Sequence, residues 1–95
     1  MSDHAQVPAG AHYRLVVEAA ADANVLLRLL EPFVIHDVLP HRIDVAHAND
    51  ALQVELEITA APEIADRLES RLRAMVPVFD VAMACLRPAP VLTAA

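Results

Sequence analysis

The chain has 95 residues, and apolar side chains make up 57% of it. This length supports one domain with a small core, which gains stability when it associates with another chain. The net charge is −6, and all seven basic residues are arginine. With no basic run and no aromatic platform for stacking bases, the composition argues against binding of nucleic acid.

The compartment follows from what the sequence lacks. A single cysteine excludes a disulfide within the chain. The start has no basic segment followed by a long apolar one, and no run approaches the ~18–20 apolar residues of a membrane span. We expect a cytoplasmic protein that does not bind membranes, with one domain over residues 12–86. A flexible leader over residues 1–11 and a flexible tail over 87–95 are expected to flank it.

The first half of the domain predicts a strand and a helix. Every second side chain of His12–Ala20 is apolar, as in a strand with one buried face. Asp22 or Asn24 then begins a helix, because either side chain can accept hydrogen bonds from a first turn. Pro32 falls inside this helix, so we expect a kink or an early end. The side chains expected to face the core are Val25, Leu26, Leu29, Leu30, Phe33 and Val34.

The second half predicts a hairpin, a helix and a last strand. The hairpin strands are Arg42–His47 and Leu52–Thr59, with Asn49-Asp50 as the turn. A helix begins at Pro62 and is stopped by Pro77, and a strand follows over Val78–Leu86. The side chains expected to be buried are Leu52, Val54, Leu56, Ile58, Ile64, Leu68, Leu72, Met75, Val76, Val81, Met83 and Cys85.

The order strand, helix, strand, strand, helix, strand predicts an α+β fold, the βαββαβ ferredoxin-like sandwich. Right-handed crossovers place both helices on one face of a four-stranded antiparallel sheet. The sheet edges carry no runs of charge, so they could pair with another chain.

Two segments resemble a known family. Residues 25–45 are VLLRLLEPFVIHDVLPHRIDV, and residues 68–81 are LESRLRAMVPVFDV. Both are similar to the ACT domain of acetohydroxyacid synthase (acetolactate synthase) small subunits, of the short, single-domain type. The resemblance covers residues 12–86 and implies an ACT-like fold.

The resemblance also implies a function. Such a chain would be a non-catalytic regulatory subunit, a homodimer without a cofactor of its own. It would activate a thiamine-diphosphate-dependent catalytic subunit in branched-chain amino acid biosynthesis. Many family members bind valine, using the loop after the first strand, which implies a ligand site at Asp22, Ala23 and Asn24 and a branched-chain amino acid as effector.

The effector loop departs from the family's pattern. The family has an Asn, a Pro-Gly pair and a further Asn, whereas this chain has Ala21, Ala23-Asn24 and Leu39 at these positions. Glycine lets a backbone approach a ligand carboxylate, and asparagine supplies polar contacts. We therefore expect activation of a partner rather than amino-acid sensing. The alternative for Asp22 and Asn24 is helix capping, which does not exclude ligand contact.

Three histidines are weak candidates for a metal site. His36, His41 and His47 lie close in sequence and are residue types that ligate zinc. Strand alternation separates them from Asp44, so we expect solvated or capping histidines and no metal. Cys85 shares the parity of Val81, which predicts a small buried side chain rather than a nucleophile.

Glu55 and Glu57 are two residues apart on the outer sheet face. Paired carboxylates catalyse proton transfer when burial shifts their pKa, but on an open face they keep the protein soluble. Arg14 is expected to pair with one of them across the strands.

Two other functions remain open from the sequence. One is a stand-alone homodimeric ACT-type sensor of an amino acid. The other is a small ferredoxin-like enzyme that uses the histidine cluster. Fold alone does not choose between them, because this architecture carries many functions.

Overall fold

The computed structural model describes residues 10–88, in which the elements follow the predicted order. The strands are β1 (Ala11–Ala20), β2 (Arg42–Ala48), β3 (Ala51–Ala60) and β4 (Val78–Arg87), and the helices are α1 (Ala23–Ile35) and α2 (Pro62–Arg73). Strand bounds agree with the predicted ones to within one residue. Most of the predicted leader and tail lies outside the described residues.

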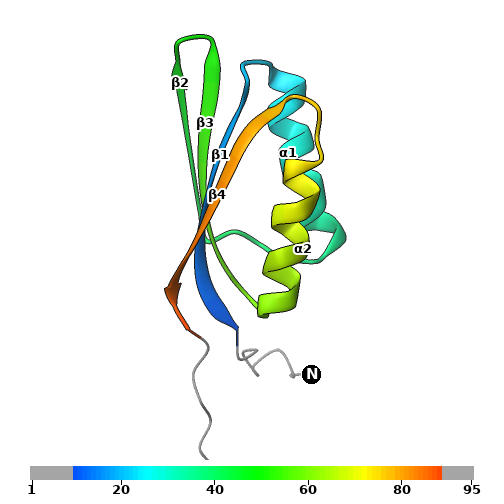
Figure 1. The fold of residues 1–95 in the computed structure, drawn as a ribbon, viewed down its shortest axis with the longest axis vertical. Coiled ribbons are helices and arrows are strands. Elements are labelled where there is room, and N and C mark those ends of the chain that lie inside the picture. Colours follow the sequence, from blue (N-terminus) through cyan, green and yellow to red (C-terminus); the bar gives the residue numbers. More distant parts are fainter. Residues whose placement is uncertain (1–9, 89–95) are drawn as a thin grey trace, which may run out of the picture.

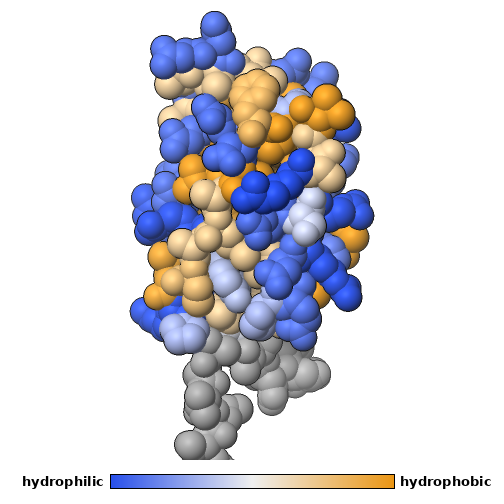
Figure 2. Space-filling model, viewed as in Figure 1, coloured by the Kyte–Doolittle hydropathy of each residue, from blue (hydrophilic) through white to orange (hydrophobic). Residues whose placement is uncertain are grey.

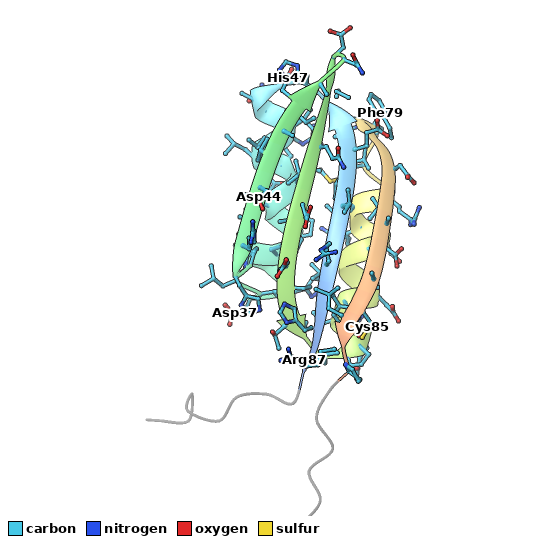
Figure 3. All side chains as sticks on the ribbon, turned by 90° about the vertical axis from the view of Figure 1, so that its left-hand side faces the viewer. Asp37, Asp44, His47, Phe79, Cys85 and Arg87 are labelled. Carbon is cyan, nitrogen blue, oxygen red and sulfur yellow. The ribbon has the colours of Figure 1, made fainter. Side chains whose placement is uncertain are left out.

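The four strands form one antiparallel sheet in the order β2-β3-β1-β4. Both helices lie on the same side of this sheet (Figure 1). Figure 3 shows the opposite, uncovered face toward the viewer, with the helices behind it. The predicted ferredoxin-like βαββαβ fold is therefore confirmed.

The core lies between the central strands and the helices. The alternation predicted for β1 and β3 is observed, since Leu15 and Val17 lie opposite Leu56 and Val54 and all four are fully buried. From the helices, Leu29 and Phe33 of α1 and three residues of α2 complete the packing. These three are Ala65, Leu68 and Leu72.

Local signals fix the start and end of α1. Asp22 caps its first turn by accepting a hydrogen bond from the backbone N–H of Asn24 at 2.8 Å. At the other end, Asp37 adopts a left-handed conformation with φ of 55°. The Asp37 N–H donates to the Val34 carbonyl at 3.1 Å, and the Val38 N–H donates to the Phe33 carbonyl at 2.8 Å. This is a Schellman motif, and it ends the helix three residues after the buried Pro32.

The β2–β3 hairpin turns at the predicted Asn49-Asp50. Both residues have positive φ, 52° and 66°, as a two-residue type I′ turn requires. The register across the hairpin is unbroken from Ala48↔Ala51 to Arg42↔Glu57. The turn therefore sets which β2 side chains lie on the helix side of the sheet.

Four predictions about single residues are wrong. Val34 is 77% exposed, since it lies on a flank of α1 turned away from the core. Val76 is 95% exposed because α2 ends at Arg73, before Pro77 could stop it. Cys85 is exposed near the end of edge strand β4. Gly10, expected in a loose leader, packs so closely against Ala60 that a Cβ atom would lie 2.9 Å from its backbone.

Candidate functional site

The loop between β1 and α1 borders a shallow hollow. Ala21, Asp22 and Ala23 line it from the loop, and His47 joins them from the end of β2. The remaining lining residues, Leu26 and Leu52, are apolar, and the hollow measures about 250 Å³. Asn24, the third predicted ligand residue, contributes its backbone N–H to the Asp22 cap. Capping is thus the observed role of Asp22, and ligand binding at Asp22, Ala23 and Asn24 stays a prediction.

The structure places the three candidate histidines in three different regions. His36 caps the end of α1, and His47 lies beside the β1–α1 loop. On the uncovered sheet face, His41 Nε2 lies 2.8 Å from the Thr59 hydroxyl, and its ring meets that of His12 edge-on. Within residues 10–88, no three His, Cys, Asp or Glu side chains come close enough to hold a metal ion. The sequence cluster is therefore not a cluster in space.

The uncovered sheet face carries a ladder of charges. Arg14 lies between the two predicted carboxylates, with Nε 3.1 Å from Glu55 and Nη2 3.9 Å from Glu57. Glu57 also lies 3.5 Å from His12, an ion pair when the imidazole is protonated. The Arg14 Nε and His12 Nε2 atoms are buried but not aligned for hydrogen bonds, although carboxylates are near. The predicted cross-strand pairing of Arg14 is confirmed.

Cys85 and Tyr13 lie opposite each other at the β1–β4 pairing. Burial raises the pKa of the Tyr13 phenol above its ordinary value, and the charges of Cys85, Asp66 and Glu63 raise it further. Tyr13 is part of the hydrophobic core, with 8% of the residue exposed. We assign it no chemical step.

Sequence reasoning missed a hollow between the helices. Its lining comes from the end of α1, with His36, and from α2, with Asp66, Arg67, Ser70 and Arg71, and it measures about 340 Å³. The two guanidinium groups could receive a carboxylate or a phosphate. The arginines are four residues apart on one helix, but only the structure shows that His36 joins them.

Two groups of large apolar side chains are exposed on the domain, in addition to Ile35, Leu39 and Leu86. The first, which we call the α1–β2 edge, consists of Leu27 and Val34 of α1 with Ile43 and Val45 of β2. The second, the α2–β4 end, consists of Val76 and Phe79. Figure 2 shows orange side chains gathered over the connection from α2 to β4, and a mixture of blue and pale orange side chains over the rest of that face. Exposed apolar groups on a small domain are candidates for contact surfaces.

No helix within residues 10–88 is long and apolar enough to cross a lipid bilayer.

Comparison with known proteins decides the family. Residues 4–89 match the ACT-like domain family. The chain belongs to this family. The ACT-like domain is thus a regulatory or ligand-binding module in its general character. A comparison with curated proteins gave no match.

Two solved structures share the fold of this ACT-like domain. The C-terminal domain of the MgtC protein from Mycobacterium tuberculosis has a TM-score of 0.67 and 15% identity, covering 90% of this chain and 97% of that one. The ACT domain from GTP pyrophosphokinase of Chlorobium tepidum has a TM-score of 0.69 and 13% identity, covering 79% and 99%. At these identities the likeness shows the fold alone.

Proposed function

We propose that this ACT-like domain is a non-catalytic regulatory subunit that acts by binding another chain. The partner we propose is the catalytic subunit of a thiamine-diphosphate-dependent acetolactate synthase, which the sequence resemblance implies. The observation that carries the proposal is the exposed apolar surface, since the core is complete without it. Seventeen residues form that core, and none of the exposed apolar side chains is among them.

The α2–β4 end is the surface we assign to the catalytic subunit. Val76 and Phe79 lie within residues 68–81, one of the two segments that carry the resemblance. Both are well exposed, Val76 at 95% and Phe79 at 61%. Behind them, Arg73 holds the end of α2 against β4, because its guanidinium donates to the Val81 carbonyl and pairs with Glu69 at 3.0 Å. The side chains of Val76 and Phe79 are therefore held in place on the surface by the contacts of Arg73.

The test is reconstitution with an acetolactate synthase catalytic subunit from the same cells. We expect the two chains to co-purify and acetolactate formation to rise when this chain is added. Phe79→Ser should weaken both effects. Ile35→Ser is the matched control, because Ile35 is equally exposed at 60% but lies on α1. If there is no complex and no change in rate, the proposal is wrong.

A second function is favoured by the hollow at the β1–α1 loop, which has room for a small amino acid and carries one carboxylate, that of Asp22. An amino-acid sensor should gain thermal stability with ligand concentration, by about 2.7 kcal/mol at one hundred times the dissociation constant. A screen of valine, leucine and isoleucine at millimolar concentration measures this gain. Asp22→Ser keeps the cap but removes the carboxylate, so it should lower the gain. A flat response to all three amino acids would exclude sensing of them.

A further inference from the structure

The hollow between the two helices, which we call the helix hollow, is separate from the one at the β1–α1 loop. It measures about 340 Å³, against about 250 Å³ for the loop hollow, and the two share no lining residue. They also lie at opposite ends of α1, because the loop hollow adjoins Ala23 and the helix hollow adjoins His36. A ligand in the helix hollow would therefore not compete with an amino acid at the loop.

The polar side chains of the helix hollow lack partners within residues 10–88. None of its five lining side chains takes part in a side-chain hydrogen bond or ion pair there, although three other arginines are paired with carboxylates. Glu63 lies one turn before Arg67, but an exposed pair at this spacing would contribute little and a ligand could displace it. Arg67 and Arg71 thus keep their donors for a ligand.

The helix hollow is a positive place on a negative protein. Two guanidinium groups and the carboxylate of Asp66 give it a charge of +1 when His36 is neutral, whereas the whole chain carries −6. In Figure 2, most side chains over α2 are hydrophilic and drawn in blue. A small anion near this surface is therefore attracted locally, although the net charge of the chain repels it.

The spacing of the two arginines favours a phosphate group. Residues four apart on a helix are surface neighbours, with Cβ atoms ~5–6 Å apart. Two guanidinium groups can then approach the three terminal oxygens of one phosphate from two sides, whereas a single guanidinium already engages both oxygens of a carboxylate. Ser70 and His36 line the same hollow and can donate further hydrogen bonds.

Asp66 restricts what the phosphate is attached to. Its carboxylate repels a second phosphate group, but it accepts hydrogen bonds from hydroxyl groups. No phenylalanine, tyrosine or tryptophan lines the helix hollow, so a nucleobase has no such ring to stack on. The volume lies near the lower end of the ~300–1,000 Å³ of small-molecule sites. These features fit a compact ester with hydroxyl groups better than a nucleotide.

We propose that the helix hollow binds a small phosphate monoester that carries hydroxyl groups, such as a sugar phosphate. Arg67 and Arg71 hold the phosphate, and Ser70 and His36 donate hydrogen bonds to it. Asp66 accepts a hydrogen bond from a hydroxyl group of the ligand. Because His36 caps the end of α1 and the other four residues lie on α2, the ligand joins the two helices. This site does not depend on the synthase or on amino-acid binding.

Isothermal titration calorimetry of the full chain with glucose-6-phosphate tests the proposal. Both arginines are exposed, so we expect a dissociation constant on the order of 0.1–1 mM. Glucose should not bind, and inorganic phosphate should bind several-fold more weakly because it lacks the sugar hydroxyl groups. No binding of the ester up to about 20 mM, well above that expectation, overturns the proposal. So does equal binding of inorganic phosphate, or tighter binding of adenosine monophosphate.

Neutral variants test whether the two arginines form the site. Arg67→Gln and Arg71→Gln should each weaken binding by about tenfold, because each removes charge-assisted hydrogen bonds. Arg28→Gln is the matched control, since Arg28 is exposed and makes no ion pair within residues 10–88, but lies ~12 Å along α1 from His36. It should change the affinity by less than about twofold, because salt screens charges at this distance. Equal weakening by all three variants would show general attraction by charge and overturn the proposal.

Amide chemical shifts locate the bound ester. In nitrogen–proton correlation spectra, glucose-6-phosphate should shift the amides of His36 and Ser70 and leave those of Asp22 and Ala23 unchanged. Asp66→Asn provides a second readout, because removing the carboxylate should strengthen the binding of inorganic phosphate and reduce the preference for the ester. If the shifts occur at Asp22 and Ala23 and not at His36 and Ser70, the ester binds at the β1–α1 loop and the proposal is wrong.

Discussion

Replacing Asp22 with alanine tests whether the Asp22 side chain stabilises the fold by capping α1. The carboxylate accepts from the Asn24 N–H at 2.8 Å, and the first turn of α1 contains no other acidic residue. Losing an N-cap costs ~1 kcal/mol, and losing the only negative charge at the positive helix end costs ~0.3–1 kcal/mol more. We therefore expect Asp22→Ala to lower the free energy of unfolding by about 1.5 kcal/mol, or roughly 6–12 °C in Tm for a domain of this size.

Urea unfolding followed by far-ultraviolet circular dichroism measures this loss. The slope of the free energy against urea should stay unchanged, because the folded core is the same. Asp22→Ser is the control, since a hydroxyl can accept the same hydrogen bond without a charge, and it should lose about 0.3–1 kcal/mol only. If Asp22→Ala is as stable as the wild type, the cap contributes nothing and the residue's role lies elsewhere.

Three further predictions concern the core and the ends of α1. Phe33→Ala should lower the free energy of unfolding by about 3–5 kcal/mol, because this side chain is 2% exposed and fills the core. Chemical denaturation measures this loss, and a loss below ~1 kcal/mol would contradict the packing described. Asp37→Gly should raise the unfolding free energy by up to ~1 kcal/mol, because glycine adopts the positive φ without strain; a loss of stability would contradict the helix end described. The folded chain holds the pKa of Tyr13 above the value of 10.0 that it has when unfolded, so the unfolded state loses its proton first and stability falls as the pH rises above about 10. Tyr13→Phe should reduce this fall in a pH series of urea titrations, and an unchanged fall would assign it to another group.

The sequence predicts most of the fold because its strongest patterns are local. The alternation in β3 identifies its buried face, and the Asn49-Asp50 pair identifies the turn. The cross-strand pairing of Arg14 with one of the carboxylates of Glu55 and Glu57 follows from their common place on the polar face of the sheet. These features depend only on residues that are close in the chain or directly across the sheet. The alternation of apolar residues and the residue types in the turn specify such neighbours.

The predictions of burial are wrong where the apolar pattern of one element does not show whether another element covers it. Val34 has the helical spacing of a core residue, but it lies on the flank of α1 that faces the uncovered edge of the sheet. Likewise, Cys85 has the parity of the buried Val81, but it lies near the end of an edge strand. Burial of these residues depends on the lengths and positions of other elements.

The candidate site was less predictable than the fold. Alternation places His41 on the same face as Ile43, but a bend precedes β2 and His41 Nε2 contacts Thr59 on the uncovered face. His36 and His47 lie at opposite ends of the α1-to-β2 segment, one beside α2 and one beside the β1–α1 loop. The two histidines are only eleven positions apart in the sequence, but β2 runs away from the end of α1 and carries His47 with it.

The most direct test of the central claim, that this domain regulates by binding another chain, is a titration of acetolactate formation. The catalytic synthase subunit is held at fixed concentration while the chain is added, first as the wild type and then as Phe79→Ser. We predict a saturable rise in rate with the wild type and a weaker rise, or one shifted to higher concentration, with the variant. A rate that stays the same at every concentration of the wild-type chain would contradict the account.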